Sequence, residues 1–336
     1  MILAVLGTIV SSIYVGHLPH FSANDLKILF ILSMLLVIVR GLEHSALFPA
    51  IEGRLSQGKW LPLQLIVITA ILSMFVTNDA ALLVMVPFTL NLSVSHKNWI
   101  VIAEAMSANI GSALTPIGNP QNLYIYSHYH VHVLQFMAEI LPFVAVGLFG
   151  LVVWGWSLNS GFKNATKARK VFLDRNSYVF GFFLLLIMLV VLHILPFYLS
   201  ALVLIYVLLV DRRLLKIDYS LLLTFFLFFG FSNNLVSLID FRFVRPGRIF
   251  WFSALSSQVI SNVPTALLFA KFTGNWRDLL WGVSVGGLGN LVGSLANLIA
   301  YRFYSQRTGK VTSFLWQFHV VGYLAFGISC LIYYLV

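Results

Sequence analysis

Long apolar stretches, separated by short polar or Gly/Pro-rich clusters, make up almost the whole chain. Because about 20 residues cross a bilayer, stretches of this kind predict membrane-spanning helices. The pattern therefore predicts an all-α polytopic membrane protein with about nine crossings. We expect the spans at 1–15, 26–40, 99–126, 133–157, 177–195, 197–210, 219–238, 276–304 and 314–336.

Two further apolar stretches, 60–95 and 250–271, carry a polar kernel near the middle. The first kernel is Thr77-Asn78-Asp79, and the second runs from Ser261 to Thr265. Polar groups at mid-membrane are tolerated only where protein or a water-filled cavity covers them. Each stretch is therefore interpreted as a re-entrant helical hairpin that enters and leaves on the same side.

The spans 99–126 and 276–304 are interrupted. Segment 109–122 holds two prolines and two glycines, and segment 286–297 breaks with glycine alone. Proline lacks the N–H of a helix and clashes with the preceding turn. Unwinding exposes carbonyls that coordinate a cation, and it leaves a half-helix N-terminus that favours an anion. The alternative is a plain kink that neighbouring helices satisfy.

The two halves of the chain repeat the same order of elements. Residues 1–157 and 197–336 each contain two spans, a hairpin, an interrupted span and a closing span, whereas 158–196 holds a basic loop and a linking helix. One odd crossing turns the second half upside down relative to the first. Inverted repeats with discontinuous helices are typical of secondary transporters.

Composition narrows the class of protein. The chain is 60% hydrophobic and 10% charged, whereas soluble domains are roughly 45–50% apolar and about 25% charged. A soluble enzyme and a disordered chain are therefore excluded, and the single cysteine, Cys330, excludes an intrachain disulfide scaffold. The net charge of +10 needs no nucleic-acid partner, because 15 of the 21 Lys and Arg residues fall on one side of the predicted topology. By the positive-inside rule that side, with the N-terminus, is cytoplasmic.

Asp79 is the strongest single candidate for a residue that couples transport to an ion or a proton. A carboxylate near mid-membrane costs roughly 2.5–3.5 kcal/mol on insertion scales, and such residues usually line ion or proton paths. The alternative is a helix cap, in which Asp79 accepts backbone N–H bonds. Glu104 is the other acid well inside a span. Proton coupling and structural pairing are both open for it.

No catalytic set is found in the sequence. The chain has no phosphate-binding glycine loop with lysine, no HExxH motif and no plausible Ser–His–Asp arrangement. We therefore expect no enzyme activity and no cofactor, apart from Na⁺ or H⁺ as a coupling ion.

Two pairs of motifs carry a family resemblance. Residues 75–81 with Pro87, residues 111–123, and the second-half stretches 257–264 and 286–298 resemble the arsenite-efflux permease and sodium/proton antiporter branch of the ion transporter superfamily. The pattern is most similar to a bacterial inner-membrane subgroup described as anion or citrate transporter-like. Dicarboxylate carriers of the superfamily have Ser-Asn-Thr at both tips, whereas this chain has Thr-Asn-Asp and Ser-Asn-Val.

The resemblance implies a homodimer in the plasma membrane, with a scaffold domain and a transport domain that moves as an elevator. It implies two cation sites and a substrate site between the hairpin tips. The first cation site would use Thr77, Asn78, Gly111, Ser112 and Thr115, with Asp79 beside them, and the second would use Ser261, Asn262, Gly289 and Ser294. The substrate would contact Thr77, Asn78, Asn119, Gln121, Asn122, Ser261, Asn262, Thr265 and Asn297.

The function that follows is secondary active transport of a small anion or oxyacid, coupled to Na⁺ or H⁺. Arsenite-like and di- or tricarboxylate substrates are both open. The nearest alternative is a sodium/proton antiporter that moves no anion. An anion channel and an intramembrane enzyme are alternatives from other classes.

Overall fold

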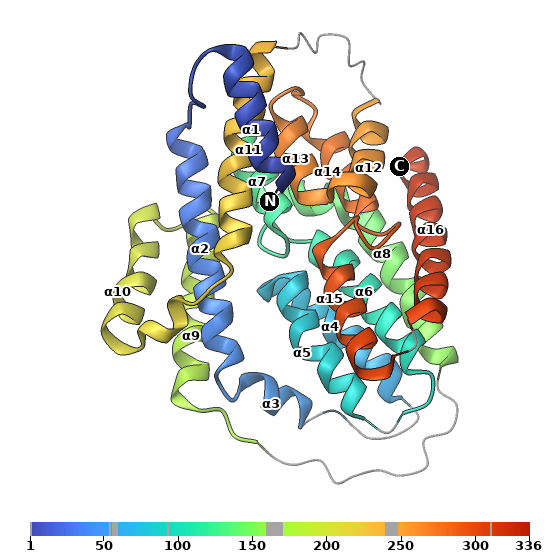
Figure 1. Ribbon diagram of the computed structural model, residues 1–336. Coiled ribbons are helices and arrows are strands. Elements are labelled where there is room, and N and C mark those ends of the chain that lie inside the picture. The colour runs from blue at the N-terminus through green and yellow to red at the C-terminus, as the bar shows by residue number, and fades with distance from the viewer. Residues whose placement is uncertain are drawn as a thin grey trace.

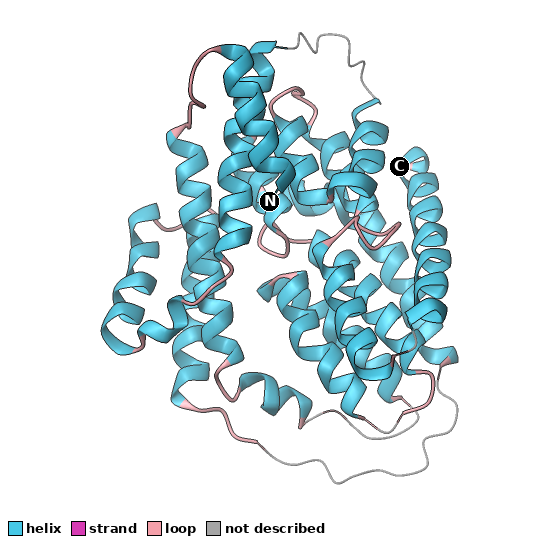
Figure 2. Cartoon of the chain, in the orientation of Figure 1, coloured by secondary structure: helices cyan, strands magenta, loops and turns pink. Residues whose placement is uncertain are grey.

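The computed structural model describes residues 2–53, 55, 60–92, 94–158, 171–238, 248–309 and 311–336. Every regular element in these ranges is a helix (Figures 1 and 2), so the expected all-α class is confirmed. Part of the argument for orientation lies outside the described residues. This applies to 159–170 of the basic loop and to Arg54, Lys59, Lys163, Lys167, Arg169, Lys170, Arg242, Arg245 and Lys310.

Eight helices are described in the first half of the chain. They are α1 (Ile2–Val15), α2 (Ala23–Glu43), α3 (Leu47–Glu52), α4 (Leu61–Val76), α5 (Asn78–Asn91), α6 (Lys97–Ala113), α7 (Pro120–His128) and α8 (Val133–Ser157). Helix α9 (Arg175–Val191) links it to the second half. That half contains η1 (Phe197–Ser200), α10 (Ala201–Val210), η2 (Arg212–Leu215), α11 (Tyr219–Leu238), α12 (Arg248–Ile260), α13 (Asn262–Ala270), α14 (Trp276–Gly286), α15 (Leu295–Thr308) and α16 (Val311–Leu335).

Both polar kernels and both Gly/Pro-rich segments lie at helix junctions. Helix α4 meets α5 at Thr77, and α12 meets α13 at Ser261. The span expected at 99–126 is split into α6 and α7, and the span expected at 276–304 is split into α14 and α15. Local chemistry explains the splits, because proline and glycine stop an α-helix wherever the chain has no other support.

Three helices among the described residues have the length and apolar composition of a membrane span: Val133–Ser157, Tyr219–Val236 and Val311–Leu335. Four apolar helical stretches are shorter, at Ala4–Val15, Leu61–Val76, Arg175–Val191 and Phe197–Val210. The total of nine crossings stays a prediction.

The two helical hairpins approach the centre from opposite ends of the molecule. At the first end, which we call the Arg40 end, Leu55 packs with Leu61 of α4 and Ile100 of α6, and the Lys97 ammonium donates to the Leu90 carbonyl at 2.7 Å. Both ends of the α4–α5 hairpin therefore lie there.

The other end of the molecule is marked by the start of α2. There Asp25 forms an ion pair with Lys271, just past α13, with 3.4 Å between Oδ1 and Nζ. Phe250, near the start of α12, stacks on Tyr333 of α16 at 3.9 Å between ring centroids. Both ends of the α12–α13 hairpin lie at this Asp25 end. From Asp25 to Arg40 helix α2 rises about 22 Å.

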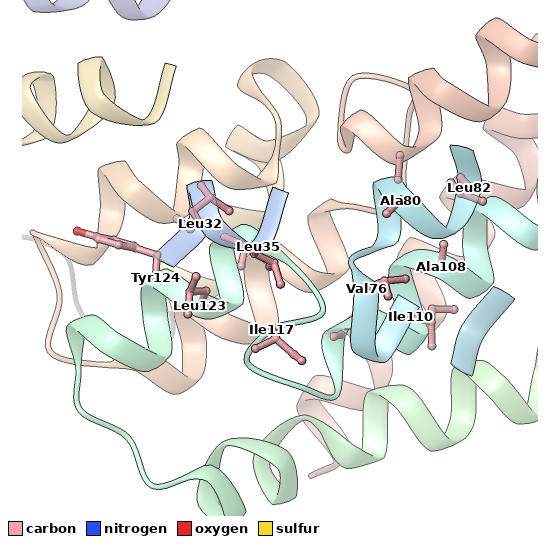
Figure 3. Close-up of a cluster of buried hydrophobic side chains, with 14 of the residues drawn as sticks. Leu32, Leu35, Val76, Ala80, Leu82, Ala108, Ile110, Ile117, Leu123 and Tyr124 are labelled. Carbon is pink, nitrogen blue, oxygen red and sulfur yellow. The ribbon is translucent and has the colours of Figure 1, made fainter. Parts of the chain in front are cut away.

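Apolar side chains hold the first broken helix in place. Ile117 lies in the break itself, and Leu123 and Tyr124 of α7 gather with it near Leu32 and Leu35 of α2 (Figure 3). All five side chains are buried. In a bilayer such contacts stabilise the fold through close packing, because lipid tails are as apolar as leucine. The break is therefore packed into the hydrophobic core.

Candidate functional site

The candidate site begins at the two hairpin tips. Thr77 and Ser261 have φ angles of 86° and 74°, a region that only glycine adopts readily and that costs other residues about 1–3 kcal/mol. The next residue in each half is fixed to a broken segment. The Asn78 N–H donates to the Gly118 carbonyl at 3.1 Å, and the Asn262 N–H donates to the Gly293 carbonyl at 2.9 Å. Each tip is thus docked onto the break of its own half.

One asparagine in each half closes the end of the preceding half-helix. The Asn122 amide nitrogen lies 3.0 Å from the Ser112 carbonyl, 3.2 Å from that of Ala113 and 3.0 Å from that of Thr115. The Asn297 amide donates to the carbonyls of Gly287 at 2.9 Å and Asn290 at 3.0 Å. Carbonyls at a helix C-terminus need such external partners.

Two glycines make this close approach feasible. A Cβ at Gly118 would lie 2.2 Å from the Ser112 carbonyl oxygen, and one at Gly293 would lie 2.5 Å from that of Gly286. Neither position has room for a side chain. The sequence analysis placed Gly111 in a cation site. In the structure, a Cβ added at Gly111 would lie 2.5 Å from the Ala70 carbonyl oxygen of α4. Gly111 therefore serves the packing of α6 on α4.

Buried amides join the two halves of the chain. The Asn109 amide donates to Asn297 Oδ1 at 2.7 Å, and the Asn78 amide lies 3.1 Å from Asn109 Oδ1 and 3.5 Å from Ser294 Oγ. All four side chains are buried. The tip of the first hairpin thus reaches the broken helix of the second half. We call these four residues the amide network.

Four half-helices begin around the amide network: α5, α7, α13 and α15. The residues that precede the last three, Asn119, Ser261 and Ser294, make no side-chain cap hydrogen bond. The Asn119 amide donates instead to Ser112 Oγ at 2.6 Å. Uncapped N–H groups and aligned peptide dipoles give each N-terminus a partial positive charge, which favours an anion.

Oxygen acceptors without a protein partner lie in the same region. Among the described residues these buried atoms include Asp79 Oδ1, Asn119 Oδ1, Gln121 Oε1 and Asn122 Oδ1. Buried acceptors normally have a hydrogen-bond partner. Oxygens of this kind suit a hard cation or a hydroxyl donor.

Asp79 lines a cavity of about 210 Å³ together with Thr77 and Pro120. Its other wall includes Arg40 and Lys216, and Glu43 and Asp218 lie on it too. Other side chains cap the first turn of α5, because Asn78 Oδ1 accepts the Asp79 N–H at 2.9 Å and Thr77 Oγ1 accepts the Ala80 N–H at 3.4 Å, and Asp79 Oδ1 has no hydrogen-bond partner in the described part of the chain. The carboxylate faces the cavity instead. Sequence reasoning did not find the charged residues that share this cavity with Asp79, since nothing local links α5 to α2 or to the residues between η2 and α11.

Three other predicted site residues make contacts that hold the helices and their breaks in place. Thr115 Oγ1 donates to the Met74 carbonyl at 2.5 Å, which ties the first break to α4. Thr265 Oγ1 donates to the Ser261 carbonyl at 2.8 Å. A Cβ at Gly289 would lie 2.2 Å from Gln258 Oε1.

Gln258 is a residue that the sequence reading missed. Its amide donates to the Gly286 carbonyl at 2.6 Å, and its Oε1 accepts the Asn290 N–H at 2.9 Å. Gln258 therefore holds the second break open. A lone amide within the apolar helix α12 was the available signal.

Glu104 forms its hydrogen bond outside the amide network. Its Oε1 accepts a hydrogen bond from Thr89 Oγ1 at 2.6 Å, and the side chain is fully buried between α5 and α6. This contact supports structural pairing for Oε1, whereas Glu104 Oε2 is buried without a hydrogen-bond partner in the ranges that the structure describes.

An apolar, all-helical chain whose broken helices meet at a buried polar centre is an integral membrane protein of the transporter class. Residues 1–275 match the family model described as a citrate transporter, CitMHS. The chain belongs to this family and is a transporter.

Two relatives span most of this chain, and a third spans less than half of it. An uncharacterized transporter of Methanocaldococcus jannaschii is 31% identical over 322 residues, covering 90% of this chain and 86% of its own length. The inner membrane protein YbiR of Escherichia coli is 32% identical over 329 residues, covering 89% and 84%. The silicon efflux transporter LSI3 of Oryza sativa subsp. japonica is 34% identical over 155 residues, covering 43% and 32%.

Proposed function

We propose that this protein is a secondary active transporter that moves a small anion or oxyacid and couples it to Na⁺ or H⁺. One observation carries the proposal: uncapped half-helix N-termini and unpartnered carboxylate and amide oxygens surround one buried amide network. The N-termini suit a negative solute, and the oxygens suit a cation. Binding both together lowers the electrostatic cost that either alone would meet away from water.

In this proposal the two halves are inverted repeats. Support comes from the matched contacts of the tips with Gly118 and Gly293, and from hairpins whose ends lie at opposite ends of the molecule. Each hairpin is then re-entrant. Basic residues such as Arg40, Lys97 and Lys216 favour a cytoplasmic Arg40 end, and the name of the relative YbiR fits an inner membrane.

Transport would proceed by alternating access, with the hairpins and broken helices moving as one body against α2 and α11. The cavity at Asp79 lies between α5 and α2. At the Asp25 end, α11 packs on α13 and Asp25 pairs with Lys271. A cavity beside α5 and packed contacts at the Asp25 end are together what is expected of an elevator transporter in its inward-facing state. The same proposal includes a homodimer, because such a scaffold requires two copies of the chain.

The substrate in this proposal is a weakly charged oxyacid in preference to a tricarboxylate. Asp79 sits beside the centre and lines its access cavity, and an ionised carboxylate there repels a multiply charged anion. Buried amide oxygens instead accept hydrogen bonds from hydroxyl groups. The relative LSI3, named as a silicon efflux transporter, agrees with this choice.

Flux measurements in proteoliposomes test the proposal. Arsenite, silicate, citrate and succinate would each be offered under an imposed Na⁺ or H⁺ gradient. We expect gradient-driven flux of an oxyacid, and loss of that flux in Asp79→Asn with unchanged thermal unfolding. Ion exchange with no solute flux would establish the antiporter instead, and currents without a carrier-like turnover would establish a channel.

A matched control tests whether the loss of flux in Asp79→Asn is specific to that position. Asp211 is an exposed carboxylate that caps η2 and accepts the Arg213 N–H at 3.0 Å. Asp211→Asn removes the same charge from the chain without touching the cavity. It should therefore transport like the unaltered protein. Full coupled flux in Asp79→Asn would remove Asp79 from the mechanism.

A further inference from the structure

A polar pocket lies at the Asp25 end, on the seam between α8 and α16. It has a volume of about 590 Å³ and is lined by Glu139 of α8, Arg277 and Trp281 of α14, and Tyr333 of α16. We call it the head pocket. Its size falls in the range of small-molecule sites. It is separate from the amide network and from the Asp79 cavity, so transport as proposed above leaves it unexplained.

Glu139 and Arg277 pair within the head pocket, and a second carboxylate, Asp278, accepts a hydrogen bond from the Tyr333 hydroxyl at 2.9 Å. Arg277 Nε lies 3.3 Å from Glu139 Oε2, and the Trp281 indole donates to Glu139 Oε1 at 3.0 Å. The Arg277 side chain is 64% exposed, which leaves guanidinium N–H groups free to reach a phosphate. One carboxylate beside one guanidinium and two aromatic rings matches a zwitterion that carries an ammonium and a phosphate.

An apolar groove follows the head pocket along the same two helices. It has a volume of about 390 Å³ and is lined by Gly147 and Gly150 of α8 and by Leu324, Ile328 and Ile332 of α16, among others. We call it the tail groove. Ile332 is directly followed by Tyr333 of the head pocket, so the two hollows lie next to one another along α16.

The tail groove has the length and surface of an acyl-chain site. From Val321 to Ile332, helix α16 rises about 16 Å, close to half of the roughly 30 Å hydrocarbon core. A Cβ at Gly150 would meet no atom within 4 Å. Leu324 and Ile328 are 63% and 53% exposed, so the groove opens toward the surroundings of the helices, which in a membrane are lipid.

We propose that this seam binds one phospholipid with an ethanolamine headgroup. The ammonium joins the Trp281 indole and Arg277 as a donor to Glu139, the phosphate accepts from Arg277, and one acyl chain fills the tail groove. An anionic phosphatidylglycerol headgroup offers Glu139 only neutral hydroxyl donors, and no ammonium offsets the repulsion between its phosphate and this carboxylate. The lipid would fix α8 and α16, which flank the body that holds the hairpins.

Native mass spectrometry of the delipidated full chain tests this proposal without any transport assay. Phosphatidylethanolamine and phosphatidylglycerol with the same acyl chains would be offered together. We expect one phosphatidylethanolamine per chain to be retained in preference. Arg277→Ala and Gly150→Leu should each lower its retention about tenfold, the loss that one charge-assisted hydrogen bond or a filled groove produces.

Controls separate the two parts of the site. Gly327→Leu places the same side chain on an exposed position of α16 where a Cβ meets nothing within 4 Å, and it should bind like the unaltered chain. Glu139→Gln should shift the preference toward phosphatidylglycerol. Thermal unfolding of each variant excludes misfolding as the cause.

Three outcomes would overturn the proposal. One is equal retention of both lipids by the unaltered chain. Another is complete displacement by glycerophosphoethanolamine, which has no tails and would make this a site for a soluble zwitterion. The third is a dimer that Gly150→Leu dissociates while lipid retention is unchanged, since the groove would then hold a second copy of the chain.

Discussion

Neighbouring side chains in the first turn of α7 have different surroundings. Asn122 binds the carbonyls at the end of α6, whereas Gln121 Oε1 is buried with no protein partner. A buried group with partners supports the fold, and a buried acceptor without one is free for a ligand. Asn122 Oδ1 lacks a partner among the described residues too, so the two residues differ in the amide nitrogen of Asn122, whose hydrogen bonds support the fold.

Substitutions at these two positions should therefore act differently. Asn122→Ala leaves several carbonyls unsatisfied and should lower the free energy of unfolding by about 1–3 kcal/mol. Gln121→Leu keeps the volume and should leave thermal unfolding unchanged while reducing solute flux. Unfolding in detergent and flux per folded molecule are the measurements. The reverse pattern would assign Gln121 to the framework.

A substitution at Glu104 distinguishes proton coupling from structural pairing. If Glu104 carried the coupling proton, Glu104→Gln would abolish proton-coupled flux. Its contact with Thr89 makes us expect the opposite: Glu104→Gln keeps an acceptor for the hydroxyl and retains flux, while Glu104→Ala is destabilised by about 1–3 kcal/mol. Flux in Glu104→Gln under a proton gradient decides between them.

At the scale of elements, the two broken helices are shaped by atoms that approach too closely for any side chain. Gly118→Ala would place a methyl group 2.2 Å from the Ser112 carbonyl oxygen. We expect it to lower the free energy of unfolding by about 1–3 kcal/mol, or to misfold. Unfolding of the purified variant is the measurement.

Gly181→Ala is the matched control for this element. Gly181 lies in α9, and a Cβ there meets no atom within 4 Å. Alanine within a helix is about 1 kcal/mol better than glycine, so this variant should be as stable as the unaltered chain or more so. A Gly118→Ala protein with undiminished stability would mean that the break tolerates a different geometry.

At the scale of the whole molecule, alternating access requires the contact between Asp25 and Lys271 to break in each cycle. In a Cys330→Ser background, the pair Asp25→Cys and Lys271→Cys should crosslink with a short bifunctional thiol reagent, because the native side chains are 3.4 Å apart. The crosslinked protein should lose all flux. Flux assays before and after crosslinking check this.

A crosslink inside the proposed moving body provides the comparison. Arg307 of α15 donates to Asn91 of α5 at 3.2 Å, so the pair Arg307→Cys and Asn91→Cys should crosslink equally well. Because both residues would move together, flux should persist. Normal flux in both crosslinked proteins would contradict a moving domain.

The sequence by itself determined the class of protein, the all-helical fold and the places where helices stop. These features are local: hydropathy selects the bilayer, and the clusters of proline, glycine and polar residues end helices, whereas the single prolines Pro87 and Pro142 lie within α5 and α8. Only the tertiary structure decided which polar groups meet. Asn109 binds Asn297, 188 positions away, Glu104 Oε1 accepts a hydrogen bond from Thr89, and Asp79 lines one cavity together with Lys216. Such pairings depend on how distant helices pack, and no local pattern of residues encodes that packing.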